Sequence, residues 1–317
     1  MKEMVLSKGF FEKKRNTIEL LAALIVISIL LKIFIPKFYS LSNITNILEQ
    51  VSTVGILAVG ISFVLVGGGM DISLSANLCC SAVVGSLVMR STGNIALGVG
   101  LMFVTALAFG LLNGVSVAYF NMVPFIVSLS SMVVANGLGV LLCQSKSVYG
   151  LPESYLNALT ISVLGIPLTI YALAIMVVLY WFILNKSSLG RRIFATGSNE
   201  NTAVICGVNA RLVKMSTYLF SAFSAGLVAV FLTARLGCAS MQMASDSTNM
   251  DVMCSAILGG VSIYGGKGNI WGAFIGACII VIFSNLVNLA GINYYPSLMI
   301  KGVVIILITY LDTRRAR

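Results

Sequence analysis

Long apolar runs recur along almost the whole chain, and they limit it to folds that are stable in lipid. Of its 317 residues, 58% are hydrophobic and only 9% are charged, whereas soluble domains carry about 25% charged residues. A helix that crosses a bilayer needs roughly 20 apolar residues. The chain is therefore predicted to be an all-α integral membrane protein, a polytopic helical bundle forming a single domain over residues 1–317.

About ten transmembrane or re-entrant helices are expected. Several of the runs are short enough to re-enter the membrane on one side instead of crossing it, and a polar segment, residues 144–162, is expected on the external side. The expected helices cover residues 17–35, 44–66, 76–89, 95–119, 123–143, 163–184, 215–235, 252–264, 270–290 and 298–311.

The positive charges follow the topology of a membrane protein. The formal net charge is +10, and most Lys and Arg residues fall in the N-terminal tail, the segment 185–214, Lys267 and the C-terminal tail. Cytoplasmic loops of membrane proteins carry an excess of Lys and Arg. These segments, and both termini, are therefore expected in the cytoplasm, and the charge needs no nucleic-acid partner to explain it.

The composition argues against metal and acid–base chemistry. The chain has no His and seven scattered cysteines. Without His it lacks the usual general base and metal ligand, and the cysteine spacing suggests neither a disulfide framework nor a zinc site. The segment GGVSIYGGKGN contains no phosphate-binding loop, because Gly268 stands where Ser or Thr is needed. No enzymatic activity, cofactor or metal is expected in this chain.

One polar segment, residues 185–214, interrupts the apolar runs and predicts a cytoplasmic loop. Ser198 or Asn199 is placed to cap a short helix, Glu200–Cys206, which Gly207 would end. A short amphipathic helix can dock into a groove on a partner protein. The alternative is a solvated loop without a partner.

Polar side chains within the apolar runs are the candidates for a translocation pathway. Carboxylates are costly at membrane depth, and an Asn amide both donates and accepts hydrogen bonds, as a passing polyol requires. The alternative roles are capping of the following helix for the carboxylate and hydrogen bonding between helices for the amides. The candidates are Asp71, Asn113, Asn136, Asn285 and Asn288.

Five segments together carry a resemblance to a known family. GGGMDISLS (67–75) is similar to the glycine-glycine-x-Asp-Leu-Ser signature of the sugar-type permeases of ATP-binding cassette (ABC) importers, the group with ribose, xylose, galactose and autoinducer-2 permeases. The other four follow in the order and spacing of that family, over nearly the whole chain. They are LNGVSVAYFNMVPFIVSLSSM (112–132), LGRRIFATGSNENTAVICGVN (189–209), ILGGVSIYGGKGNIWGAFIGA (257–277) and YYPSLMIKGVVIILITYLD (294–312).

The resemblance implies a permease subunit in the bacterial cytoplasmic membrane that works as a homo- or heterodimer. Two cytoplasmic ATPase subunits would bind ATP and Mg²⁺, and an external solute-binding protein would deliver the solute. Ile72, Leu74, Ser75 and Cys206 depart from the family pattern, which leaves the particular sugar open. The family's ATPase-coupling segment corresponds to Gly197, Ser198, Asn199, Glu200, Asn201, Ala203, Gly207 and Val208.

The function expected from the sequence is sugar import by alternating access, driven by separate ATPases. The alternatives are a branched-chain-amino-acid-type or nucleoside permease of the same fold, an ion-coupled secondary transporter, and a membrane scaffold for signalling. A secondary transporter would need buried ionisable residues to carry protons or bind sodium. The spans offer few, chiefly Asp71 and Lys301.

Overall fold

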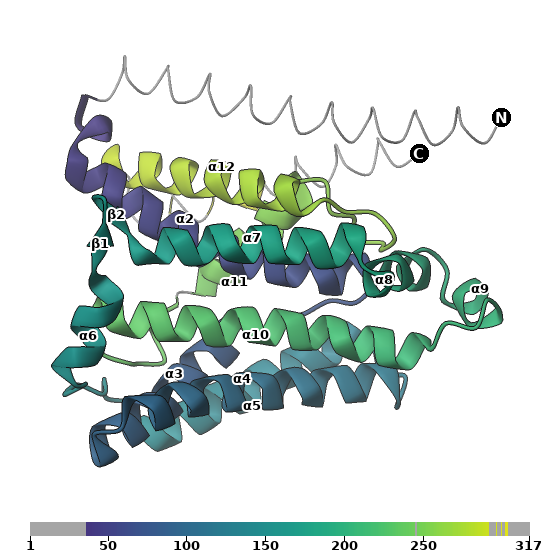
Figure 1. The fold of residues 1–317 in the computed structure, drawn as a ribbon, viewed down its shortest axis with the longest axis horizontal. Helices are drawn as coiled ribbons and strands as arrows, with labels where there is room; N and C mark the ends of the chain where they lie inside the picture. The colour runs from purple at the N-terminus through teal and green to yellow at the C-terminus, as the bar shows by residue number, and fades with distance from the viewer. Residues whose placement is uncertain (1–35, 245, 292–295, 297–298, 300–301, 304–317) are drawn as a thin grey trace.

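A computed structural model describes residues 36–244, 246–291, 296, 299 and 302–303. The span expected at 17–35 and all of that expected at 298–311 except residues 299 and 302–303 lie outside the described residues, and so does Lys301. The described part is almost entirely helical (Figure 1). Its elements are η1 (Pro36–Tyr39), α2 (Leu41–Val66), α3 (Leu74–Thr92), α4 (Ile95–Ala118), α5 (Pro124–Cys143), α6 (Glu153–Thr160), β1 (Ser162–Val163), β2 (Ile166–Pro167), α7 (Leu168–Lys186), α8 (Ser188–Ser198), α9 (Glu200–Ile205), α10 (Ala210–Leu236), α11 (Asp246–Leu258) and α12 (Ile270–Leu289).

Seven helices of the described part are long and apolar enough to cross a membrane: α2, α3, α4, α5, α7, α10 and α12. They coincide with the seven longer runs predicted within the described residues, which confirms the all-α polytopic fold. The eighth, expected at 252–264, is helical only as far as Leu258, where the 13-residue helix α11 (Asp246–Leu258) ends. At 1.5 Å per residue it is about 20 Å long, too short for a hydrocarbon core of about 30 Å.

Helices α2 and α10 form the core of the bundle. Every residue of α2 from Gly55 to Val66 is buried, and α10 packs against α2, α3 and α4. Gly110 and Gly114 of α4 permit a close approach to α10, because a Cβ at Gly110 would lie 2.4 Å from the Cβ of Ala222 and one at Gly114 would lie 3.1 Å from the Cα of Met215. Small residues at such positions let helix backbones come together in a membrane.

The external segment expected at 144–162 is more ordered than its polar sequence indicates. It contains α6, which lies with the β1–β2 hairpin at the end of the bundle opposite α8 and α9 (Figure 1). The Tyr155 hydroxyl donates to the Val230 carbonyl at 2.7 Å and pairs with Thr233 Oγ1 at 2.6 Å. Burial raises the pKa of Tyr155 to about 12. The phenol therefore stays protonated and anchors α6 to α10.

Candidate functional site

The segment 185–214 protrudes from one end of the bundle as two short helices, α8 and α9 (Figure 1). Polar residues placed before each helix start it. Ser187 Oγ accepts from the Gly190 N–H at 3.1 Å, Asn199 Oδ1 accepts from the Thr202 N–H at 2.9 Å, and Asn209 Oδ1 caps α10. Side-chain caps of this kind satisfy orphan N–H groups at a helix start. Side-chain hydrogen bonds therefore fix where the helices of this segment begin.

Helix α9 is close to the short helix predicted from the sequence. It begins at Glu200 after the Asn199 cap and ends before Gly207, whose φ of +81° suits a glycine. Helix α8 was not predicted, because its Gly-rich and basic sequence (SLGRRIFATGS) has few helix formers. Ile193, at 0% exposure, fixes α8 against the bundle.

Helix α9 turns one side to the bundle and one side outward. Ala203 is buried, whereas the apolar side chains of Val204 and Ile205 are 54% and 85% exposed. Glu200 accepts from the Lys214 ammonium at 2.5 Å, which ties the start of α9 to α10. The exposed apolar pair gives this helix a surface that a partner can cover.

The end of α8 meets two other turns mainly through backbone atoms, with the short Ser198 side chain against Gly266. We call this contact the glycine joint and define it as Val66, Gly68, Gly197, Gly265 and Gly266. A Cβ at Gly197 would lie 1.8 Å from the Val66 carbonyl oxygen and 2.8 Å from the Gly266 nitrogen. Only glycine allows such an approach, so α8 is seated directly on the end of α2 and on the turn between α11 and α12.

The same joint connects the two glycine-rich segments found in the sequence. A Cβ at Gly265 would lie 2.5 Å from the Gly197 carbonyl oxygen and 2.9 Å from the Gly68 Cα. Gly68, Gly265 and Gly266 all have positive φ, a backbone conformation that disfavours other residues. Among the expected coupling residues, Gly197 and Ser198 touch the joint. Asn201 and Gly207 are exposed, and Val208 is half-buried.

Asp71 lies in a buried polar cluster at the start of α3. Its carboxylate accepts from the Ser73 N–H at 3.0 Å, the Ser73 hydroxyl at 2.6 Å and the Ser221 hydroxyl at 3.1 Å. Asn113 Nδ2 donates to Ser73 Oγ at 2.9 Å. The two predicted candidates Asp71 and Asn113 therefore meet through Ser73, and the cluster joins α3, α4 and α10. Asn113 Oδ1 is buried without a hydrogen-bond partner among the described residues.

Asn249, which the sequence did not single out, supplies the cap of α3. Its Oδ1 accepts from the Ser75 N–H at 3.0 Å, and its Nδ2 donates to the Ile72 carbonyl at 2.8 Å. Asp71 had been one candidate for this capping role. Asp71 instead binds the N–H of Ser73, one residue before the helix. Asn249 is 174 residues from Ser75, so no local sequence pattern could indicate that it caps α3.

Two cavities lie on either side of the α10–α11 connection. One, of about 450 Å³, is lined mainly by apolar side chains of α3, α5 and α11, with Asn136 among the few polar ones. The other, of about 430 Å³, is bounded by α2, α10, α11 and α12 and includes Asn288. Asn285 faces neither cavity, because it exchanges two hydrogen bonds with Asn43 on α2, at 3.1 and 2.9 Å. The predicted candidates are thus divided among four places.

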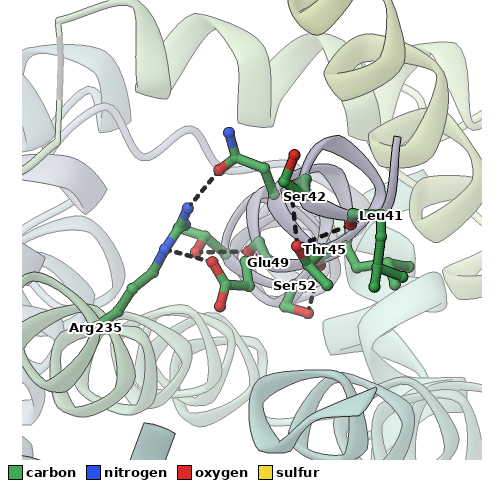
Figure 2. Close-up of polar contacts among 9 residues, drawn as sticks. Leu41, Ser42, Thr45, Glu49, Ser52 and Arg235 are labelled. Atoms are coloured by element: carbon green, nitrogen blue, oxygen red, sulfur yellow. Dashed lines mark hydrogen bonds and ion pairs between the residues drawn. The ribbon is translucent and has the colours of Figure 1, made fainter. Parts of the chain in front are cut away.

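An ion pair closes one side of the second cavity. Figure 2 shows Arg235, from the end of α10, reaching Glu49 on α2, with Nε 2.7 Å from a carboxylate oxygen. Arg235 also donates to Asn46 Oδ1 at 2.8 Å. The polar start of α2 thus has two roles: Gln50 lines the cavity, and Glu49 binds Arg235.

Comparison with known proteins identifies the family. A family described as the branched-chain amino acid transport system / permease component matches residues 43–309. The ribose import permease protein RbsC of Bacillus subtilis is 32% identical over 295 residues, which cover 92% of this chain and 91% of that protein. The D-allose transport system permease protein AlsC of Escherichia coli is 32% identical over 306 residues, 96% and 93% of the two chains.

The galactose/methyl galactoside import permease protein MglC of Escherichia coli is 29% identical over 316 residues, 91% of this chain and 92% of that protein. No solved structure matches the chain significantly. The family match includes the glycine joint, the Asp71 cluster and both cavities. With seven helices able to span a membrane, the chain is a multi-pass membrane protein, and it belongs to the family of transport-system permease components.

Proposed function

We propose that this chain is the membrane permease subunit of an ABC importer that carries a small sugar into the cytoplasm. One observation carries the proposal: relatives named as ribose, allose and galactose import permeases match more than nine-tenths of the chain at 29–32% identity. The family description mentions branched-chain amino acids. Because these relatives are named for sugars, a sugar is favoured over an amino acid.

The proposed assembly contains two permease subunits, two cytoplasmic ATPase subunits and an external solute-binding protein. The chain has no phosphate-binding loop, so ATP and Mg²⁺ would be bound by the ATPases, and this subunit transports without catalysing a reaction. The outward apolar side of α9, with Val204 and Ile205, supports docking of an ATPase. An amphipathic helix seated in a partner's groove is a common mode of recognition.

The coupling segment, residues 185–214, would transmit movement of the ATPases to the membrane helices. Val66 accepts a hydrogen bond from the Gly266 N–H at 2.8 Å, and both residues touch Gly197 at the end of α8. A shift of α8 therefore acts on the end of α2 and on the turn leading to α12 at once. The ion pair between Glu200 and Lys214 would make α9 move together with α10. Alternating access would follow from tilting of these helices.

The charges support a cytoplasmic membrane location with this end of the bundle and both termini inside. Lys267 lies in the α11–α12 turn, which meets α8 at the glycine joint. Basic residues of the 185–214 segment are on the same side. Cytoplasmic ends of membrane helices carry this excess of positive charge.

Sugar uptake by the assembled transporter tests the proposal. The chain would be co-produced with its ATPase and binding protein, and uptake of labelled ribose, allose and galactose would be measured with active and with inactivated ATPase. Uptake that needs the active ATPase is the expected result. Uptake that survives inactivation but stops when the proton gradient is collapsed would replace the importer with an ion-coupled transporter.

A further inference from the structure

The two cavities of this chain differ in chemistry although they are nearly equal in volume. The first has four methionines in its wall. The second, which we call the outer polar cavity, is lined by side chains that can hydrogen bond, placed on four helices and the α10–α11 connection. These are Gln50, Thr53, Arg235, Gln242, Ser247, Thr248, Asp251, Ser284 and Asn288.

The outer polar cavity lies in the half of the bundle that is remote from α8 and α9. Its walls come from the N-terminal half of α2, the last turn of α10, the first turns of α11 and the C-terminal half of α12. These helix ends lie toward the end of the bundle that carries α6 and the hairpin (Figure 1). A solute that arrives from outside would meet this cavity before it reached the glycine joint.

Its wall offers both donors and acceptors. Gln50, Gln242 and Asn288 contribute amides, which donate and accept. Ser284 Oγ is buried and has no hydrogen-bond partner among the described residues. A buried hydroxyl without a partner is energetically unfavourable. If the Ser284 side chain rotates toward the cavity, a ligand hydroxyl there would supply the missing partner.

The remaining wall suits the carbon skeleton of a sugar. Leu232, Leu236 and Val281 line the same cavity, and apolar side chains of this kind pack against C–H groups. The guanidinium of Arg235 is already engaged by Glu49 and Asn46. With its cation neutralised by Glu49 and the Asp251 carboxylate also in the wall, the cavity disfavours an anion. Its volume of about 430 Å³ is within the range of about 300–1,000 Å³ of small-molecule sites.

We propose that the outer polar cavity is a sugar-binding subsite within each permease subunit, where a neutral monosaccharide is held by Asn288, Ser284 and Gln50 on its way inward. The inference rests on the proposed function. It assigns the discrimination between related sugars partly to the permease: epimers place one hydroxyl differently, and a wall of directed polar groups distinguishes them.

A matched pair of serines tests the subsite. Ser284 and Ser131 both have buried hydroxyls without a partner among the described residues, but only Ser284 lines the outer polar cavity. Ser284→Ala, Asn288→Leu and Ser131→Ala would be assembled with the ATPase and the binding protein in proteoliposomes. Uptake of two epimeric sugars and ATP hydrolysis would be measured in the same preparation.

Loss of a hydrogen bond to the solute should lower the sugar moved per ATP by about threefold to tenfold. It should also change the uptake ratio of the two epimers in Ser284→Ala and Asn288→Leu, while Ser131→Ala behaves as the unmodified protein. Equal epimer ratios in all four proteins, with normal uptake, would exclude the subsite. If the unmodified transporter moves no sugar, the proposed function itself is wrong. Failure of the subsite alone is different, because the unmodified transporter then still moves sugar.

Discussion

Gly266 donates its backbone N–H to the Val66 carbonyl at 2.8 Å, and so joins the turn before α12 to the end of α2. The two residues are 200 positions apart in the chain, and Gly197 at the end of α8 packs on both. Contact that is mainly between backbone atoms, with only the short Ser198 side chain beside it, leaves no long flexible side chain to absorb movement. The joint therefore transmits displacement between α8 and the bundle directly.

Gly197→Ala should separate ATP hydrolysis from transport. The added Cβ would lie 1.8 Å from the Val66 oxygen, and overpacking of this kind is unfavourable by about 1–3 kcal/mol. We expect α8 to move off α2, so that the assembled complex still hydrolyses ATP but takes up about tenfold less sugar, a loss equivalent to 1.4 kcal/mol of barrier. Uptake and ATPase rates measured on the same proteoliposomes give the ratio.

Gly137→Ala is the matched control for this substitution. Gly137 also lies in a helix, but no atom stands within 4 Å of its would-be Cβ. Its replacement should leave both rates unchanged. Similar uptake in the two variants would show that the close contact at Gly197 has no part in coupling.

Glu200→Ala should affect transport more than stability. The Glu200 and Lys214 side chains are 43% and 21% exposed, and exposed ion pairs contribute only about 0–1 kcal/mol. The melting temperature should therefore change little. Because the pair fixes α9 on α10, uptake per ATP should fall, and the charge exchange Glu200→Lys with Lys214→Glu should restore it. Failure of the exchange to restore uptake would mean that Glu200 acts through another contact.

The sequence predicted the membrane helices well, because a run of about 20 apolar residues has few alternatives in lipid. Seven of the predicted runs are spanning helices in the described part, and α9 has the Asn199 cap and the Gly207 end expected for it. Patterns of this kind are local, so each can be recognised without knowledge of the rest of the chain.

What the sequence could not provide is which distant residues meet. Asn285 was considered for the pathway, but it pairs with Asn43 across 242 positions. Asn249 has no local pattern, yet it caps α3. The two glycine-rich segments of the joint can be recognised in the sequence, but their contact with each other and with the end of α8 depends on helix packing. Helix ends were therefore predictable from local patterns, and the polar contacts between helices were not.

Asn249→Ala should destabilise the protein through α3. It removes the acceptor of the Ser75 N–H and the donor to the Ile72 carbonyl, and loss of a cap typically costs about 0.5–2 kcal/mol. Thermal unfolding in detergent should show a lower melting temperature. Asn136 and Asn249 both line the first cavity, but Asn136 caps no helix. The melting temperature of Asn136→Ala should therefore be close to that of the unmodified protein. Equal melting temperatures for the two variants would contradict the capping role.

Tyr155→Phe should loosen α6 from α10 in a manner that depends on pH. The change removes the phenol hydrogen bonds to the Val230 carbonyl and Thr233 at 2.7 and 2.6 Å. Because Thr233 Oγ1 still donates to the Val230 carbonyl, the expected loss is about 0.5–1.5 kcal/mol. Burial raises the pKa of Tyr155 from 10.0 to about 12. The folded state thus holds the proton more tightly than the unfolded state. The stability supplied by the phenol is complete below pH 10 and is lost as the pH rises through 12.

Melting temperatures of the unmodified protein and Tyr155→Phe, measured from about pH 7 to about pH 11, would show this dependence, because the range includes the ordinary Tyr pKa of about 10. Tyr149→Phe is the control, because Tyr149 is 63% exposed and its loss should change the melting temperature little. The advantage of the unmodified protein over Tyr155→Phe should be constant near neutral pH and shrink in the alkaline samples. A difference that is the same at every pH would show that ionisation of the phenol is not linked to the anchor between α6 and α10.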